Sequence, residues 1–478
     1  MGYADGLLTD EAANQELERA REISDRWRIY LGEHDKPLKV TAPEGGPVID
    51  DNITPNFCGR FVDQGVSFLF GGDVVFTLDP GETAQEEGDI KVSPDETYLD
   101  DVWRANRRKT LLPKFGLNGG VAGHAYFKIL PRGKQLPRLL NLDPCCVSVQ
   151  WDEEDIETVV AYKVQWNVSR AGKDMVRRQL VEFQDDGSWL ITDEIGEEQI
   201  SRTMYGAELS TWVWKEVASP VEWRYPFPPI VDCQNLPLPN EYYGTPDLSR
   251  DVTDLNTATS RVLSNLSRVI RFHGHPKTIF KGVQEGDIRV DADGAIYLPD
   301  GEGQDASNLE MSSDLSASLS VYREVYDALH EVGRRPKIAA GKLDNIGQLS
   351  GLAIKILYGP LVEVTRTKQG PYGDCLVELN KRLLVLAGKA EYDSAPETTL
   401  HWPELLPTDE LAEVNAALGL DQLGVSKATL IERQGFDSRT EAARKASEAQ
   451  ATLDNIQTSF NAGGHMGINQ PGGGPVNG

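Results

Sequence analysis

Apolar residues recur at helical spacing through the first part of the chain. Thr9 can cap a helix whose apolar positions run over 10–31, and similar spacing predicts helices over 55–69 and 99–117. A short run of β-branched and aromatic residues, 74–78, predicts a strand between the second and third helices. This segment is therefore expected to be mainly helical.

The spacing changes to short apolar runs between residues 121 and 223. Turn residues, such as those at 185–187, separate these runs, so we expect strands joined by turns. The predicted strands are 125–129, 147–151, 159–166, 179–183 and 189–192. A proline-rich stretch over 225–239 then predicts an extended connector and a boundary after Pro239. Helices followed by such strands indicate the α+β class.

Two later segments carry apolar residues at spacings that alternate mainly between four and three, which is a heptad seam. One position of the first seam is Thr259, and its other members are Leu248, Val252, Leu255, Val262, Leu266 and Val269. The second seam consists of Leu315, Leu319, Tyr322, Tyr326, Leu329 and Val332. Asp247 near the start of the first helix, and Arg268 and Arg271 near its end, suit the helix dipole. A seam does not name its partner, which is either the same chain or another copy.

A small β module lies between these two helices. Gly274 and Pro276 end the first helix, and strands are predicted over 278–280, 288–290 and 295–298, the last two flanking a hairpin turn. The unit is thus a long helix, a compact β insertion and a second long helix. Such a stalk exposes much surface for its volume, so we expect its seam to be buried against other copies.

The last part of the chain is again mostly helical. After a loop over 337–348, a long helix is expected over 350–386, kinked where Pro360 and Pro371 each remove a hydrogen bond. Short helices are expected beyond Pro407. The final stretch is rich in Gly and Asn and lacks an apolar pattern, so it is expected to be disordered.

Composition narrows the class of protein. The 478 residues include 40% hydrophobic and 26% charged residues, which is ordinary for a folded protein of about three domains. The formal net charge of −26 argues against a tight binder of nucleic acid, because phosphate affinity comes from Lys and Arg. Neither a signal peptide nor a membrane span is expected, which indicates a soluble protein made inside the cell.

Residue patterns for catalysis or metal binding are incomplete. Each Gly-Lys pair lacks the Ser or Thr of a phosphate-binding loop, and His330-Glu331 lacks the second histidine of a zinc protease motif. His273 and His275 have no further His or Cys nearby, and a hairpin turn accounts for the aspartates at 291 and 293. The five scattered cysteines are expected to be free thiols: Cys58, Cys145, Cys146, Cys233 and Cys375. We therefore expect no catalytic site, no metal and no cofactor.

Several local phrases follow one another around the stalk and cover most of residues 20–450. They are Tyr30-Leu31-Gly32-Glu33-His34, Asn52-Ile53-Thr54-Pro55-Asn56, Phe68-Leu69-Phe70-Gly71, residues 119–129, Asn141-Leu142-Asp143-Pro144, Gln348-Leu349-Ser350-Gly351 to Pro360-Leu361, and Ser426-Lys427-Ala428-Thr429-Leu430. In this order they resemble portal proteins, the head–tail connectors of tailed double-stranded-DNA bacteriophages, of the type common in long-tailed phages.

The resemblance implies a multi-domain α+β architecture that assembles into a ring, usually of twelve subunits. Its parts would be a wing (1–245), a stem helix (246–272), a β clip (273–314), a second stem helix (315–336), a tunnel loop (337–349), a kinked wing helix with a return strand (350–402), a helical crown (403–460) and a disordered tail (461–478). The ring would form a channel at one capsid vertex for packaging, retention and ejection of double-stranded DNA. A separate ATPase would drive the DNA, so the chain itself is not expected to be an enzyme.

The resemblance also implies contact residues and partners. The clip residues that would dock the terminase large subunit, and later the head–tail adaptor, are Ile288, Arg289, Asp291, Asp293 and Tyr297. The tunnel-loop residues near DNA would be Lys337, Ile338, Lys342, Leu343, Asp344, Asn345, Ile346 and Gln348. The stem seam between copies would be Leu248, Val252, Leu255, Val262, Leu266, Val269, Leu319, Tyr322, Tyr326 and Leu329. Major capsid and scaffolding proteins are further expected partners, with assembly in the host cytoplasm, a place in the virion and no membrane contact.

Two other classes stay open from the sequence. One is a different structural virion component, such as an adaptor or a minor capsid protein. The other is an enzyme with its site in the strand-rich region 121–223, which a convergent cluster of titratable side chains in a closed pocket would favour. The loop over 337–348 is also explained as an ordinary helix connector. In a ring, the acidic charge would suit a channel wall along which DNA slides without being held.

Overall fold

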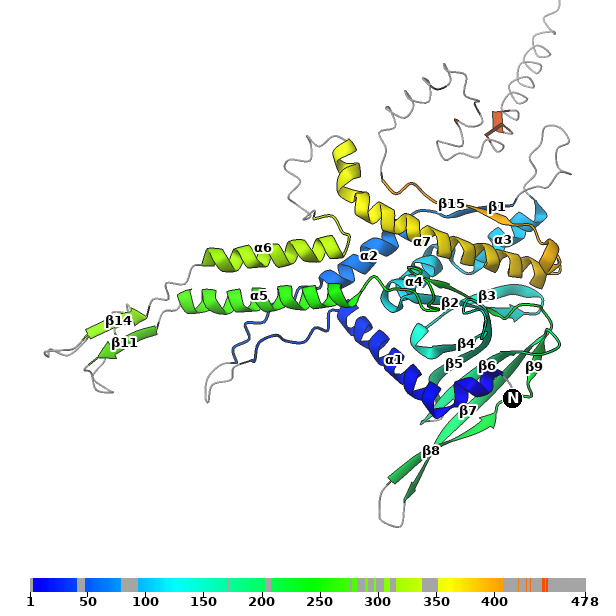
Figure 1. Ribbon diagram of the computed structural model, residues 1–478, viewed down its shortest axis with the longest axis horizontal. Coiled ribbons are helices and arrows are strands. Elements are labelled where there is room, and N and C mark those ends of the chain that lie inside the picture. The colour runs from blue at the N-terminus through cyan, green and yellow to red at the C-terminus, as the bar shows by residue number, and fades with distance from the viewer. Residues whose placement is uncertain are drawn as a thin grey trace, which may run out of the picture.

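The computed structural model describes residues 3–40, 48–78, 93–170, 172–202, 208–274, 277–281, 289–290, 296–297, 305–309, 315–337 and 351–406, with isolated positions at 420, 427, 430, 441, 442, 444 and 445. These residues form a body of helices and antiparallel sheets, from which one pair of helices projects (Figure 1). The α+β class predicted from the sequence is confirmed.

The first helices begin where the sequence places their caps. Helix α1 (Asp10–Tyr30) follows Thr9, whose hydroxyl accepts the Ala12 N–H at 3.2 Å. Helix α2 (Phe57–Phe70) follows Asn56, whose side chain accepts the Gly59 N–H at 2.9 Å. Strand β1 (Val75–Leu78) pairs with the distant strand β15 (Thr398–His401). The two predicted helices and the predicted strand are therefore confirmed.

The third predicted helix is two helices. Helix α3 (Pro94–Ala105) ends just before Arg107, which adopts a positive φ of 56°, and helix α4 (Arg108–Ala122) then starts in a new direction. Asn106 stabilises this break: its side chain donates to the Pro137 carbonyl and accepts the Leu139 N–H, both at 2.9 Å. The prediction of one helix over 99–117 is wrong, because contacts with a distant strand determine the break.

Two sheets form the strand-rich part of the body. The smaller has the order β10-β2-β3, with β2 (His124–Arg132), β3 (Gln135–Leu142) and β10 (Ile230–Gln234). The larger has the order β4-β5-β6-β7-β8, with β9 beside β7; its strands are β4 (Val147–Trp151), β5 (Val159–Arg170), β6 (Lys173–Phe183), β7 (Trp189–Arg202), β8 (Glu208–Glu216) and β9 (Val221–Trp223). The five predicted strands are present, whereas β3, β8, β9 and β10 were not predicted. Short 3-10 turns occur at Tyr3–Leu8, Pro144–Cys146 and Tyr392–Ser394.

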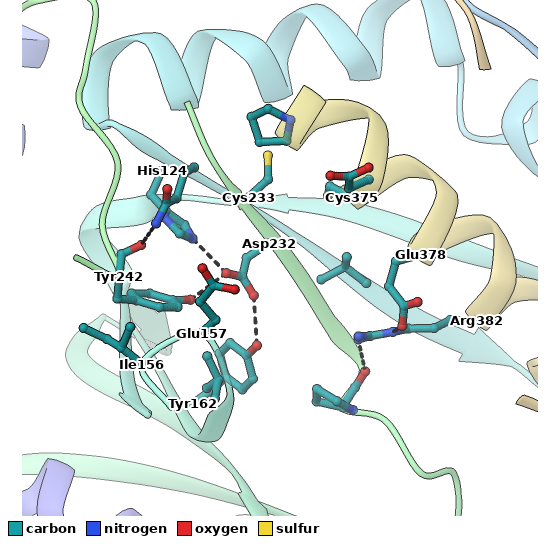
Figure 2. A pocket seen from close by; sticks show the side chains of 16 residues that line it. His124, Ile156, Glu157, Tyr162, Asp232, Cys233, Tyr242, Cys375, Glu378 and Arg382 are labelled. Carbon is teal, nitrogen blue, oxygen red and sulfur yellow. Dashed lines mark hydrogen bonds and ion pairs between the residues drawn. The ribbon is translucent and has the colours of Figure 1, made fainter. Parts of the chain in front are cut away.

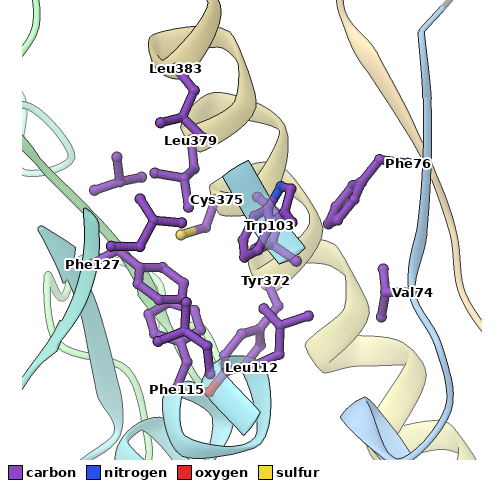
Figure 3. Close-up of a cluster of buried hydrophobic side chains, with 14 of the residues drawn as sticks. Val74, Phe76, Trp103, Leu112, Phe115, Phe127, Tyr372, Cys375, Leu379 and Leu383 are labelled. Carbon is purple, nitrogen blue, oxygen red and sulfur yellow. The ribbon is translucent and has the colours of Figure 1, made fainter. Parts of the chain in front are cut away.

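Helix α7 (Gly351–Leu386) crosses the body and joins its helical and strand-rich parts. It contains Pro360 and Pro371 and is visibly bent, so the predicted long helix interrupted by prolines is confirmed (Figure 1). Its inner face enters an aromatic core with α3, α4 and β2 (Figure 3). The rings of Phe115 and Phe127 stack there with centroids 3.9 Å apart.

The projecting pair consists of α5 (Arg250–Gly274) and α6 (Leu315–Val332), which run in opposite directions (Figure 1). At its far end, strand β11 (Lys277–Lys281) pairs with β14 (Asp305–Leu309), and β12 (Arg289–Val290) pairs with β13 (Ile296–Tyr297). The predicted hairpin is thus confirmed, whereas β14 was not predicted. Among the residues described, no helix is both long and apolar enough to cross a membrane.

Candidate functional site

The projecting helix pair buries small polar residues along much of α5. Those with at most 3% of their surface exposed are Asn256, Thr259, Ser260 and Ser264. The Ser264 hydroxyl accepts the Ile53 N–H at 2.9 Å, so the segment before α2 lies along this helix. Small side chains allow the chain to approach α5 closely, but they bury little apolar surface. Polar contacts therefore carry much of the attachment of this segment.

A charged contact also holds the segment before α2 against α5, nearer the distal end of this helix. Asp51 accepts two hydrogen bonds from the guanidinium of Arg271, at 2.7 and 2.8 Å, and a third from Arg268 at 3.3 Å. The bonds from Arg271, the largest influence, hold the pKa of Asp51 below its usual value, although desolvation opposes them. The interpretation of these arginines as partners of the helix dipole missed this contact.

The seam residues nearest the body pack within one chain. Leu248 lies before the first residue of α5, and it forms a buried cluster with Val252, with Leu329 of α6 and with residues of α2 and α4. These three side chains are at most 2% exposed. They have no free surface for a neighbouring copy, so packing within the chain explains the heptad pattern at this end of the pair.

The distal end of the pair is different. Leu319 in the first turns of α6 is 41% exposed, Val321 two residues further along is 52% exposed, and Ile270 near the end of α5 is 53% exposed. Six further seam residues are half-buried: Leu255, Val262, Leu266, Val269, Tyr322 and Tyr326. Apart from Val332, which is 44% exposed at the inner end of α6, the heptad pattern therefore has an inner part that one chain satisfies and an outer part that stays accessible.

A buried charge cluster holds the base of the pair to the body. Asp247, just before α5, accepts hydrogen bonds from Lys368 of α7 at 2.5 Å, from Asn235 at 3.0 Å and from Arg335, just after α6, at 3.3 Å. The two cations and the carboxylate each have side chains that are 3% exposed. A single carboxylate thus connects both helices of the pair to α7. The sequence placed Asp247 in the helix, whereas it lies before it and is buried.

The shared carboxylate determines the protonation behaviour of this cluster. Burial acts to raise the pKa of Asp247, but attraction to Lys368 and Arg335 outweighs it and holds the pKa below its usual value. Burial lowers the pKa of Lys368. Attraction to Asp247 raises this pKa again only in part, since the one carboxylate is shared by two cations. A charged Asp247 is therefore a condition for holding both cations inside the protein.

The predicted loop and tip residues are only partly described. Lys337 follows α6 and forms an ion pair with Asp327 at 3.1 Å. The other predicted loop residues, Ile338, Lys342, Leu343, Asp344, Asn345, Ile346 and Gln348, lie outside the described residues. At the tip, Arg289 and Tyr297 pair across β12 and β13. Ile288, Asp291 and Asp293 lie outside the described residues.

The body also contains a hollow of about 500 Å³ between α7 and the two sheets, a feature that bears on an enzymatic function (Figure 2). Asp232 lies at its centre and accepts hydrogen bonds from Tyr242 at 2.6 Å, from His124 at 2.8 Å and from Tyr162 at 2.9 Å. Burial acts to raise the pKa of Asp232, but these bonds and the attraction of His124 hold it below its usual value. The carboxylate is already fully engaged by its neighbours, which is typical of a structural role.

The Cys233 thiol at this hollow is a poor nucleophile. Burial raises the pKa of Cys233 well above its usual value, and its neighbour Cys375 raises it further. All five cysteines are free, as expected. Within the described ranges, no group of three His, Cys, Asp or Glu side chains is placed to hold a metal ion. The hollow has titratable groups, and burial works against Cys233 as a nucleophile among them.

Comparison with known proteins identifies the class to which this architecture corresponds. A family model described as phage portal protein, SPP1 Gp6-like, matches residues 10–454 of the 478. The match includes the body, the projecting pair and its β tip, so the class is that of tailed-phage portal proteins. The chain belongs to the SPP1 Gp6-like family of phage portal proteins. No curated protein matches it.

Membership of this family confirms the resemblance seen in the sequence. The family has a portal role in phages and is structural rather than enzymatic. It also implies a component of the virion capsid that works as an oligomeric assembly. The family match assigns no role to single residues, so the roles of the seam, loop and clip residues stay predictions.

Proposed function

We propose that twelve copies of this chain close into a ring around a channel for double-stranded DNA at one capsid vertex. The observation that carries the proposal is the projecting α5–α6 pair, whose distal end leaves Ile270, Leu319 and Val321 exposed. Neighbouring copies standing side by side would cover them.

In this proposal each part of the chain takes one place in the ring. The body forms the wing (1–245 with 350–402), and α5 and α6 form the stem (246–272 and 315–336). The clip (273–314) is at the tip, and the tunnel loop (337–349) follows the stem. The crown (403–460) and the tail (461–478) complete the chain. The channel serves packaging, retention and ejection of DNA.

The stem seam between copies is best placed in the outer half of the pair. Its members are Val262, Leu266, Val269, Leu319 and Tyr322, which are exposed or half-buried in one chain. The exposed residues Ile270 and Val321, adjacent in sequence to Val269 and Tyr322, would belong to the same interface. The clip, with Arg289 and Tyr297 on its paired strands, would dock the terminase large subunit and then the head–tail adaptor. Capsid and scaffolding proteins would contact the wing, and assembly would take place in the host cytoplasm.

The tunnel loop gives the proposal a functional test. Lys337→Ala removes the ion pair with Asp327, and Lys342→Ala removes a cation from the loop itself. We expect both variants to assemble as the unmodified chain does, and to change how much DNA is packaged or retained. Unchanged packaging and retention in both variants would contradict a DNA-facing loop.

Electron microscopy of the purified chain tests the assembly itself. Class averages are expected to show a closed ring with a central opening, with the helix pairs parallel to the ring axis. Leu248→Met serves as a control. Leu248 is buried within one chain and the substitution conserves side-chain volume, so this variant should form the same ring. A field of single chains or open pairs would contradict the proposal.

A further inference from the structure

The charge of the chain is unevenly distributed. Residues 102–142 contain nine Lys and Arg and no Asp or Glu, whereas the whole chain has a net charge of −26. This segment covers the end of α3, all of α4 and the hairpin of β2 and β3. In Figure 1 these elements belong to the body, far from the β11–β14 tip. A basic segment in an acidic protein indicates a surface with its own polyanionic partner.

The cations of this segment converge at the break between α3 and α4. A hollow of about 400 Å³ opens there, and its charged lining residues are Asp100, Arg104, Arg107, Arg108 and Lys109. We call these four cations, together with exposed Lys114 one helical turn beyond Thr110, the basic elbow. The positive φ of Arg107 turns the chain so that cations on both sides of the break face one hollow.

Acidic neighbours neutralise the basic elbow only in part. Arg104 pairs with Asp101 at 3.0 Å, Lys109 with Asp73 at 3.0 Å, and Arg108 with Asp100 at 3.9 Å. Both partners of the first two pairs are about half exposed or more, so these pairs are weak and exchange readily with other anions. Within the described part of the chain, no ion pair involves Arg107 or Lys114.

We propose that the basic elbow binds the phosphate backbone of duplex DNA outside the channel, without sequence preference. One guanidinium group can donate two parallel hydrogen bonds to the oxygens of a phosphate. A concave hollow also receives a protruding phosphate better than a flat acidic protein surface does. The net charge of the chain keeps the affinity low and dependent on salt. The basic elbow thus holds DNA near the body, apart from the stem and the tunnel loop.

A covalently closed duplex circle isolates this contact, because it cannot thread a ring. Binding of a fluorescent circle to the full chain is measured from 50 to 200 mM salt, with oligomeric state recorded in the same samples. The test variant combines Arg104→Ala, Arg107→Ala and Lys109→Ala, all exposed positions. The matched control removes the same charge elsewhere through Arg21→Ala, Lys173→Ala and Arg224→Ala, which are also exposed.

The test variant should bind the circle about tenfold more weakly at 50 mM salt, with a salt slope reduced by about 2 to 3, while the control changes little. Equal binding by the test variant and the unmodified chain would overturn the proposal. So would equal losses in both triple variants, which would show a response to net charge alone. A changed oligomeric state with DNA binding intact would also overturn it, in favour of a second copy at the basic elbow. Rings that form normally without binding the circle would leave the channel proposal standing and reject only this one.

Discussion

The body and the projecting helix pair are stabilised in different ways. In the body, Trp103, Phe115 and Phe127 are at most 1% exposed and pack with α7 in a continuous aromatic core. In the pair, the most buried residues along the middle of α5 are small and polar, and the distal end exposes Leu319 and Val321. The body thus contains its own core, whereas the pair has one only where it meets the body.

This difference separates stability from assembly. Stability scales with the apolar surface that a chain buries by itself, so it should depend mainly on the body. Assembly needs apolar surface that stays accessible in one chain, and in the proposed ring the distal half of the pair would supply it. The charge cluster of Asp247, Arg335 and Lys368 lies between the two regions and connects them. Substitutions in the three places should therefore have distinct consequences.

The largest loss of stability is expected from the core of the body. Phe127→Ala removes a fully buried ring that stacks on Phe115, and should lower the free energy of unfolding by about 3–5 kcal/mol. Val321→Ala in the pair, at an exposed position, should change it by no more than about 0.5 kcal/mol. Urea unfolding followed by tryptophan fluorescence measures both. Similar losses in the two variants would mean that the regions share one core.

The charge cluster should respond unequally to the loss of its members. Asp247→Asn leaves two cations buried without a carboxylate and should cost about 3–5 kcal/mol. Lys368→Met leaves Asp247 paired with Arg335 and places an apolar side chain in a buried position, so its cost should be clearly smaller. The same unfolding measurement compares them. A Lys368→Met variant as unstable as Asp247→Asn would show that Arg335 alone does not compensate the carboxylate.

Acid unfolding checks the same cluster in another way. Because the pKa of Asp247 is lowered by folding, its contribution is present above the unfolded pKa of about 4 and is lost as the pH falls toward the folded pKa. The unmodified chain should therefore lose stability below about pH 4 more steeply than Asp247→Asn. Parallel curves for the two proteins would contradict a charged, stabilising Asp247.

A smaller and local effect is expected where the segment before α2 lies along α5. Asp51→Asn weakens the contacts with Arg271 and Arg268, so the amide of Ile53 should exchange faster with deuterium while the unfolding midpoint changes little. Asp63→Asn is a matched control, because this aspartate contacts Tyr30 rather than α5. Unchanged exchange at Ile53 would mean that Ser264 alone holds the segment.

The smallest effect on stability should accompany the largest effect on assembly. Leu319→Asp and Val321→Asp place charges at exposed positions, so each should leave the unfolding free energy within about 0.5 kcal/mol. Each should nevertheless prevent association, because a buried unpaired charge is costly at an interface. Light scattering of the purified variants measures this. Normal association of both variants would place the interface elsewhere on the chain.

Local signals made much of this fold predictable. Thr9 capped α1 as expected, and the heptad spacing located α5 and α6 to within a few residues. The break at Asn106 was missed because two of its three side-chain hydrogen-bond partners are on β3, about thirty residues away. Strand β3 was missed because Pro137 and the adjacent leucines Leu139 and Leu140 hide the alternation of a strand.

The candidate site was less predictable than the fold. The heptad pattern is the same along the whole pair, but only the structure shows that Leu248, Val252 and Leu329 are buried within one chain. The charge cluster joins residues 88 and 121 positions apart, which no local spacing indicates. The absence of acidic residues over 102–142 was visible in the sequence and would have pointed to the basic elbow.

Native mass spectrometry of the purified full chain tests the ring most directly. The chain has a mass of 52.7 kDa, and the predicted species contains twelve copies of it. This species should persist when the basic elbow is altered and disappear in Leu319→Asp and Val321→Asp. A stable monomer or dimer of the unmodified chain, the same as that of Leu319→Asp and Val321→Asp at equal concentration, would contradict the ring.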